Sequence, residues 1–389
     1  ALKCTWVSDD VAMGGDSNHP PIAFYRGVMQ KPLSWHNLFK WLRYHYGKAP
    51  NPNKNWKRDN QPSHSAHPRL HHRLNLILFS GCAVFLYSFL YCVFSQQIAF
   101  AATLLFIVHP LGSQTITWVS GIGYVTGLFF TLLGLNVVYL VTDAGWMLTP
   151  LGTLGAFSLY AFCQWMAVEA IFAMVGTTLI LLWLGFYPFA IIAGLLSIHQ
   201  CLNTFKEAIV MRRKVFREQR MEASTKFYPR KFVVVFKTIY YNVKLAIFPK
   251  RMGLYHTFGY HYELPYIETE DRYWMAGVLA VGLLLAGVFL GTPVLSLGCL
   301  WFIAYGLIFF NWVTANQFVV DRYVWLPAFG ACLIVAAYAP LWLFWLIVGI
   351  AIMRTWAHLP TYLDEFQFYF SNMLNFPQSE VAMGNLGVA

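Results

Sequence analysis

The chain has 389 residues, of which 58% are hydrophobic, 18% are aromatic and only 11% are charged. Because a soluble domain usually carries about 25% charged residues, this composition argues against an ordinary soluble enzyme and predicts a polytopic membrane protein. The net charge is +10, but the basic residues alternate with apolar runs. That pattern indicates contact with membrane lipids, through headgroups or phosphorylated lipid ligands, and not with nucleic acid.

The first part of the chain, residues 1–73, is polar and rich in proline, which predicts a long extramembrane loop. Within it we expect one short amphipathic helix near residues 33–46. An acidic pair, Asp9 and Asp10, lies close to the start of this loop. The chain begins at Ala1 without a Met or a signal peptide, so we expect a further membrane helix before it.

Apolar runs then fill residues 74–203 and 274–354. A membrane-spanning helix needs roughly 20 residues, and sometimes about 17. We therefore predict an all-α membrane protein with about 10 transmembrane helices. The runs cover residues 74–94, 97–109, 118–141, 150–166, 168–185, 186–203, 274–291, 293–311, 326–340 and 341–354.

A strongly basic extramembrane segment, residues 204–273, separates the two groups of runs. Its centre, residues 212–220, is either a solvated charged helix or a site for anionic headgroups or a polyprenyl phosphate. Residues 232–249 predict an interfacial amphipathic helix, because Lys237, Asn242 and Lys244 interrupt an apolar pattern. The last segment, residues 355–389, is amphipathic and soluble in character.

The distribution of charged residues between the two sides of the membrane provides a test of these predicted spans and loops. If residues 1–73, 204–273, 312–325 and 355–389 share one side of the membrane, that side and its span ends take all 27 Lys and Arg residues. The connections on the opposite side carry Asp143 as their one charge. Such one-sidedness is not expected if a span has been missed or invented. The positive-inside rule places a basic face in the cytoplasm, although it is weak for long loops such as these.

One polar stretch between two apolar runs, residues 109–124, reads HPLGSQTITWVSGIGY. Polar groups without water or an internal partner are too costly in lipid. We therefore predict a break between two membrane helices, placed where side chains meet water or a substrate. His109 and Pro110 are typical of a helix end with a capped polar side chain, and a role for His109 in facing a site stays open.

Several fragments, taken in order, resemble one family. They are Asp9-Asp10, KPL, HRLN, HPLGSQTITWVSG, KLAIFPKRMGLY, DRYVWLPAFG, RTWAHLPTYLDE and NFPQSEVAMGNLGVA. Together they resemble the transmembrane, TPR-containing protein O-mannosyltransferases and their bacterial relatives, across nearly the whole chain. Each motif is weak alone, and the order and spacing carry the resemblance.

The resemblance implies a GT-C glycosyltransferase fold and a transferase that takes its sugar from a polyprenyl phosphate. It also implies a site on the non-cytoplasmic side, so we expect the charged face to be periplasmic or lumenal. The final SEVAMGNLGVA is similar to the opening helix of a TPR unit. Because one repeat cannot bury its own face, we expect 355–389 to begin a C-terminal TPR α-solenoid.

The acidic pair Asp9 and Asp10 matches the pair that GT-C enzymes carry in their first outer loop. The resemblance implies that one carboxylate is the general base that deprotonates the acceptor hydroxyl. An acidic pair can also hold a divalent metal through oxygen ligands. The competing interpretation is a turn or a helix N-cap, which Asp favours. His64, His67, His71 and His72 cluster in this loop, with HxxH spacing at 64 and 67, but no Cys or carboxylate is close in sequence, so no zinc site is predicted.

Arg322 and Tyr323 stand at an expected helix mouth, where a guanidinium suits a lipid phosphate. The alternative is an arginine that snorkels and pairs with Asp321. His72, with Asn75 one helical turn later, matches a family feature that favours structural hydrogen bonding over catalysis.

Five positions depart from the family pattern, and four of them are ionisable in the family. The family places Glu at Gln114, Arg or Lys at Ile122, Asp at Tyr124, and a Ser-Lys pair at Cys163 and Gln164. In the family these charges orient substrate and bind the lipid phosphate, and the residues here cannot. Intramembrane charges are costly and are usually kept for function, so their joint loss is expected if the function has gone.

Two hypotheses remain. One is a degenerate transferase that serves as a structural or assembly subunit, with partner membrane subunits held by its aromatic helix faces and TPR region. The other is an active glycosyltransferase that moves a mannose-like sugar from polyprenyl phosphate to a protein Ser/Thr or glycan hydroxyl. In it, Asp9 or Asp10 is the base, while Arg322, Tyr323, His109, Gln114 and His72 contact substrate. A transporter has little support, because no run carries a paired charge relay.

Overall fold

A computed structural model describes residues 49–50, 64–65, 68–117, 122–145, 149–166, 171–199, 202, 231–253, 273–310, 319–363 and 365–376. The acidic pair Asp9 and Asp10, the helix expected near 33–46, the basic stretch 212–220 and the TPR-like end 377–389 lie outside these residues. The expectations for them therefore remain predictions.

The described chain is helical apart from one antiparallel pair of two-residue strands, β1 (Ala49–Pro50) and β2 (His64–Ser65). The first group of helices comprises α4 (Pro68–Val93), α5 (Gln96–Val108), α6 (Gly112–Thr117), α7 (Ile122–Asp143), α8 (Pro150–Met166), α9 (Ile171–Trp183) and a helix over Tyr187–His199. The second comprises α11 (Lys231–Ile247), α12 (Tyr273–Leu290), α13 (Pro293–Gly306), η4 (Leu307–Phe309), α14 (Asp321–Tyr338), α15 (Leu341–His358), η5 (Leu359–Tyr362) and α16 (Glu365–Asn375).

Four stretches of the described helices are long and apolar enough to cross a membrane: His72–Val93, Gly123–Asp143, Tyr273–Leu290 and Leu341–Tyr362. They belong to α4, α7, α12 and the α15–η5 unit. The remaining apolar helices are shorter, so the total of about 10 spans stays a prediction. The all-helical architecture and several membrane-length helices are consistent with an integral membrane protein.

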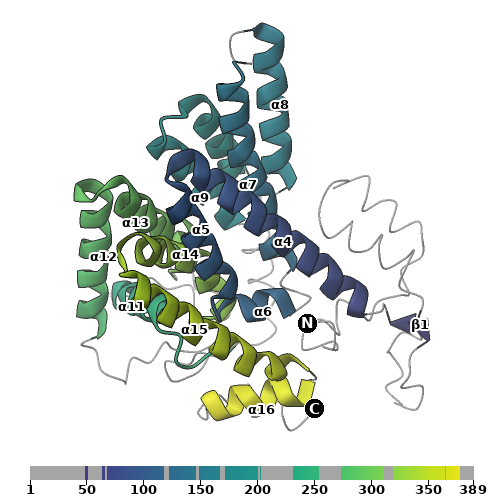
Figure 1. The fold of residues 1–389 in the computed structure, drawn as a ribbon, viewed down its shortest axis with the longest axis vertical. Helices are drawn as coiled ribbons and strands as arrows, with labels where there is room; N and C mark the ends of the chain where they lie inside the picture. The colour runs from purple at the N-terminus through teal and green to yellow at the C-terminus, as the bar shows by residue number, and fades with distance from the viewer. Residues whose placement is uncertain are drawn as a thin grey trace.

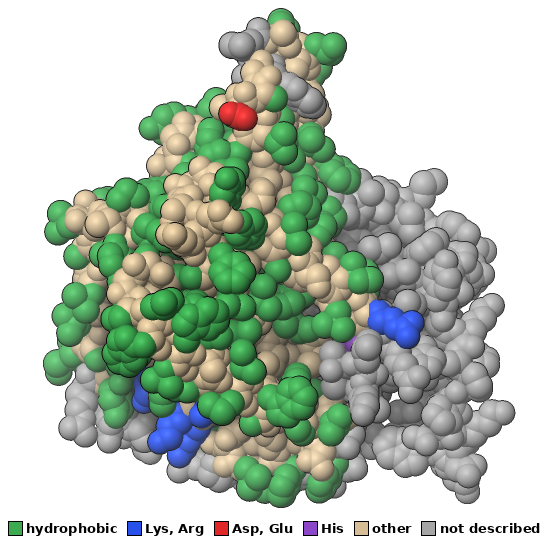
Figure 2. All heavy atoms as spheres, viewed as in Figure 1, with side chains coloured by type: hydrophobic (Ala, Val, Ile, Leu, Met, Phe, Trp, Pro, Cys, Tyr) green, Lys and Arg blue, Asp and Glu red, His purple; other side chains and the backbone are tan. Residues whose placement is uncertain are grey.

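The helices pack as one bundle (Figure 1). Helices α7 and α8 extend toward one end, α11 to α14 form a group at the side, and α15 and α16 lie at the other end. Hydrophobic side chains are spread over the visible described surface, whereas basic side chains appear in two places, toward the lower left and at the right beside the grey atoms (Figure 2). The candidate spans of α12 and α15 bury only 11% and 22% of their windows, as expected for helices that face lipid or a partner.

Helices α13 and α14 cross closely, because glycines face each other at their contact. A Cβ atom at Gly330 would collide with the carbonyl oxygen of Gly298, so the two backbones touch. Large aromatic side chains fill the space beside the crossing. Trp301 lies 4.7 Å from Phe329 between ring centroids, and its indole Nε1–H donates to the carbonyl of Leu326 at 3.1 Å.

The structure differs from two expectations, one about where a helix begins and one about which side chains of a helix are exposed. The run 326–340 belongs to α14, which begins five residues earlier, at Asp321. The helix can include these polar residues because the unpaired backbone N–H groups of its first turn find hydrogen-bond acceptors. The helix expected over 232–249 is present as α11, but its polar residues do not share a wet face. Lys237 and Asn242 are 6% and 1% exposed, whereas Lys244 is exposed.

Candidate functional site

The polar break forms a turn and a short helix between α5 and α7. After α5 ends at His109, the N–H of Gly112 donates to the His109 carbonyl at 3.0 Å. The Ser113 hydroxyl donates to the Pro110 carbonyl at 2.7 Å. We expected these side chains to meet water or a substrate. That expectation was wrong as to water, because Ser113, Gln114 and Thr115 are at most 3% exposed. Internal hydrogen bonds replace part of the missing solvation.

His109 is held by two backbone groups. Its Nε2 lies 3.0 Å from the carbonyl oxygen of Ala246 in α11, and the N–H of Leu111 points to its Nδ1 at 3.4 Å. Since a carbonyl only accepts and an N–H only donates, the imidazole carries its proton on Nε2. Both nitrogens are therefore used within the protein, which matches the capped helix end that the sequence favoured.

Other bonds fix the break to its neighbours. The Asn75 amide of α4 donates to the Ile116 carbonyl at 3.3 Å, and His72, one turn earlier, is fully buried. The Thr355 hydroxyl of α15 donates to the Val108 carbonyl at 2.8 Å. The structural role predicted for the His72–Asn75 pair is therefore visible at Asn75.

Gln114 connects the break to the first turn of α14. Its Oε1 accepts a hydrogen bond from the backbone N–H of Arg322 at 2.9 Å, and its side chain is fully buried. The N-cap residue of α14, Val320, provides no side-chain cap. Gln114 thus satisfies one of the N–H groups that the start of a helix leaves unpaired.

The side chain of the neighbouring residue Asp321 also forms a hydrogen bond within the protein. It is 1% exposed, and its Oδ2 accepts from the N–H of Gly253, in the segment after α11, at 2.7 Å. A carboxylate in the first turn of a helix is favoured by the helix dipole. Asp321 therefore joins the start of α14 to the segment that follows α11.

Arg322 and Tyr323 sit in the first turn of α14, at the helix mouth predicted for them. The Arg322 guanidinium hydrogen-bonds to the phenol groups of Tyr124 and Tyr323, and its carbon lies 5.2 Å from the centre of the Tyr323 ring. The Tyr323 ring stacks on Phe309 at 4.5 Å between centroids. Tyr124 lies 6.4 Å from each of the other two rings.

These contacts define an aromatic cluster, Tyr124, Phe309 and Tyr323, contributed by α7, η4 and α14. Two of its residues, Tyr124 and Tyr323, contact the guanidinium of Arg322, one of the groups that the sequence offered as a candidate for a lipid phosphate. Sequence reasoning missed Phe309, because it lies inside an apolar run and carries no polar signal. Tyr124 was noted only as a departure from the family pattern.

Several polar atoms around α6 lack a hydrogen-bond partner in the described part of the chain. Among them are Nε2 of Gln114, the Thr115 hydroxyl, the indole nitrogen of Trp325 and Oδ1 of Asn75. A Cβ atom placed on Gly112 would lie 3.2 Å from that indole nitrogen, so the tryptophan lies directly against α6. The region is thus buried but not fully satisfied in its polar groups.

The remaining candidate positions are less informative. The side chains of Ile122 and Gln164 lie outside the description, and Cys163 is buried in α8. Within the described segments, no group of three or more His, Cys, Asp or Glu residues is arranged to hold a metal ion.

Comparisons with protein-family models, with curated proteins and with solved structures found no significant match to this chain.

Proposed function

We propose that this chain is a membrane protein of GT-C-like architecture that has lost sugar-transfer chemistry and serves as a structural or assembly subunit of a membrane complex. The observation that carries the proposal is the bond from the Arg322 N–H to Gln114. The family pattern has an ionisable Glu at this position, whereas the neutral amide here caps a helix. A neutral amide cannot act as a base or orient a substrate through charge.

The aromatic cluster supports the same proposal. The family pattern has an Asp where Tyr124 stands, and in this chain the phenol is bonded to Arg322. A guanidinium that binds phosphate needs donors directed at the ligand. Here the guanidinium hydrogen-bonds to the phenol groups of Tyr124 and Tyr323 and lies beside the Tyr323 ring. These contacts favour a structural role for Arg322.

The exposed aromatic and apolar side chains are the surfaces that we assign to lipids and partner subunits. On α15, Trp342, Trp345 and Trp356 are 69%, 51% and 77% exposed. Trp is enriched both at membrane interfaces and at protein–protein contacts. The TPR region that we propose to begin after α15 would supply a second contact surface outside the membrane.

The second candidate function is an active transferase that moves a mannose-like sugar from a polyprenyl phosphate to a hydroxyl. It is favoured by Asp9 and Asp10 in the sequence, and by the unsatisfied polar atoms of Gln114, Thr115 and Trp325. A polar substrate could satisfy such buried groups. In this case one Asp is the base and the charged face is periplasmic or lumenal.

Purification of the full-length protein in a mild detergent separates the two candidates. The subunit proposal predicts stoichiometric co-purification of other membrane proteins, with no transfer from labelled polyprenyl-phosphate mannose. Transfer that is present in wild type and absent in Asp9→Asn/Asp10→Asn would establish the enzyme instead.

A further inference from the structure

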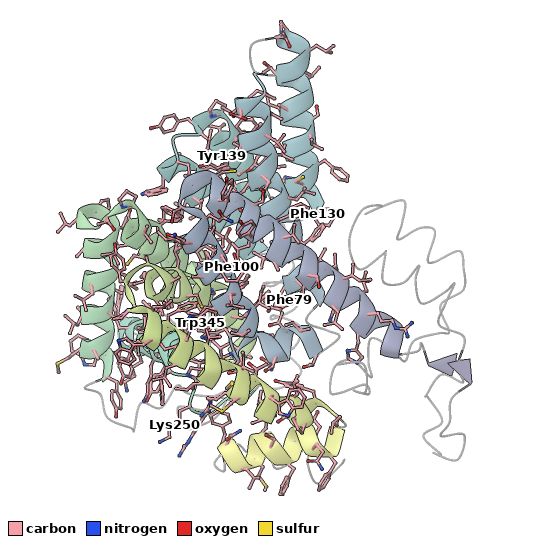
Figure 3. All side chains as sticks on the ribbon, in the orientation of Figure 1. Phe79, Phe100, Phe130, Tyr139, Lys250 and Trp345 are labelled. Carbon is pink, nitrogen blue, oxygen red and sulfur yellow. The ribbon has the colours of Figure 1, made fainter. Side chains whose placement is uncertain are left out.

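An open pocket lies between the C-terminal end of α15, η5, α16 and the segment after α11. Its volume is about 460 Å³, and its polar lining residues are Lys250, Arg354, His358, Thr361, Ser371 and Asn375. Among the described residues, neither Asp nor Glu lines the pocket. Figure 3 shows Lys250 beside α16, below the body of α15. The pocket is separate from the aromatic cluster around Arg322.

Arg354 is held in place at the pocket wall. Its Nη2 donates to the carbonyl oxygens of Pro249 and Lys250, at 2.9 Å and 2.6 Å. Its Nε has no hydrogen-bond partner in the described part of the chain. Because a guanidinium has five N–H donors in a fixed plane, these bonds orient the group and leave donors for an anion.

The polar side chains that line the pocket also interact with one another and with Tyr362. The Thr361 hydroxyl lies 3.2 Å from the Ser371 hydroxyl and 3.4 Å from Nδ1 of His358. Nε2 of His358 lies 3.3 Å from the Tyr362 hydroxyl. Lys250 is exposed at the rim. The combination of an oriented guanidinium, an exposed ammonium and hydroxyl groups suits the oxygens of a phosphate.

The position of the pocket at the end of a candidate membrane span favours an amphipathic ligand. It lies within the last turns of Leu341–Tyr362, a stretch long and apolar enough to cross a membrane. Met353 lines the pocket and is 64% exposed, and Ile352 and Trp356 extend that apolar surface along α15. An exposed Trp at the end of a span marks the level of lipid headgroups. A ligand here can place a charge in the pocket and a chain against the helix.

We propose that this pocket binds the phosphate of an anionic membrane lipid. Lys250 and Arg354 contact the phosphate, and the acyl chains lie along Met353 and the exposed face of α15. The proposal does not depend on whether the protein transfers a sugar.

The test uses the full-length protein in a neutral detergent, with native mass spectrometry to count bound lipid. Phosphatidylglycerol is the probe, and diacylglycerol, which lacks a phosphate, is the comparison. Lys250→Ala removes a charge, whereas Ala357→Leu fills the pocket from an exposed helical position and leaves the charges intact. Arg251→Ala is the matched control, since Arg251 is an exposed cation next to Lys250 that does not line the pocket.

We expect wild type and Arg251→Ala to retain one phosphatidylglycerol. Lys250→Ala should bind it about tenfold more weakly, the loss expected when one charge-assisted contact is removed. Ala357→Leu should also weaken binding, because its larger side chain occupies the pocket. Equal retention in all four proteins, or equal binding of diacylglycerol, would overturn the proposal. Displacement of the lipid by millimolar inorganic phosphate would overturn the lipid assignment in favour of a free phosphate site. The melting temperature of each variant verifies that it is folded.

Discussion

Gln114 shows how a single side chain can hold two distant parts of the chain together. It is fully buried, and it accepts from the backbone of Arg322, 208 residues away in the sequence. If a buried acceptor is removed, its donor is left without a hydrogen bond. The free-energy penalty of that unpaired donor is larger than the net stabilisation that an average hydrogen bond provides. The start of α14 should therefore be sensitive to this side chain.

We predict that Gln114→Leu lowers the free energy of unfolding by about 1–3 kcal/mol, because the Arg322 N–H then has no acceptor. The control is Thr131→Val on α7. Thr131 is equally buried, but its hydroxyl has no hydrogen-bond partner in the described structure. Its replacement by a methyl group of the same shape should be neutral or stabilising. Melting of the purified proteins in detergent measures both effects, and a neutral Gln114→Leu would contradict the capping role.

At the level of elements, the glycines of α13 and α14 allow two helices to meet at their backbones. A Cβ atom on Gly298 would lie 2.7 Å from a side-chain carbon of Ile334 and 2.9 Å from the Gly330 carbonyl oxygen. Neither distance is a normal contact for a Cβ atom. Since the interior is close-packed, any added group must move a helix.

We predict that Gly330→Ala destabilises the protein by about 1–3 kcal/mol through this overpacking. Gly282 in α12 is the matched control, because nothing lies within 4 Å of a Cβ atom added there. Gly282→Ala should be neutral or slightly stabilising, as alanine favours a helix by up to about 1 kcal/mol over glycine. If both substitutions shift the melting temperature equally, the crossing is not as close as described.

Sequence reasoning located the helices better than it located their partners. The run 97–109 corresponds to α5 at Gln96–Val108, because apolar composition over a helical length is a local property. The start of α14 at Asp321 was missed, because Gln114, which caps it, and Gly253, which hydrogen-bonds to the Asp321 carboxylate, lie in other parts of the chain. Hydropathy cannot report such contacts.

The candidate site shows the same division. The helix-mouth position of Arg322 followed from its place between apolar runs. The hydrogen bond of Arg322 to Tyr124 and the stacking of Phe309 on Tyr323 could not be predicted from the sequence, since both depend on how α7, η4 and α14 pack. The burial of the polar break was also not foreseen, because a polar stretch between apolar runs gives no sign of what will cover it.

On the scale of the whole molecule, the described charges are distributed unevenly. Asp143 ends α7, at the end where α7 connects to α8, whereas Lys250 lies near α16 (Figures 1 and 3). This arrangement agrees with the one-sided pattern that the sequence predicts for Lys and Arg. We propose that the basic end is periplasmic or lumenal, in line with the family resemblance.

Cysteine labelling tests that orientation in intact cells or sealed vesicles. Under the proposal, a membrane-impermeant maleimide added outside cells, or inside vesicles for a lumenal face, labels Lys250→Cys above the wild-type background. It does not label Asp143→Cys until the membrane is opened. The reverse pattern would place the basic end in the cytoplasm, as the positive-inside rule alone suggests.

The loss of catalysis is the central claim, and sugar transfer measures it most directly. The full-length protein, purified with any subunits that accompany it, is given labelled polyprenyl-phosphate mannose and hydroxyl acceptors. We predict no transfer above a protein-free blank for wild type, and no change in Asp9→Asn/Asp10→Asn. Transfer by wild type that the paired substitution abolishes would contradict the account and make this chain an active glycosyltransferase.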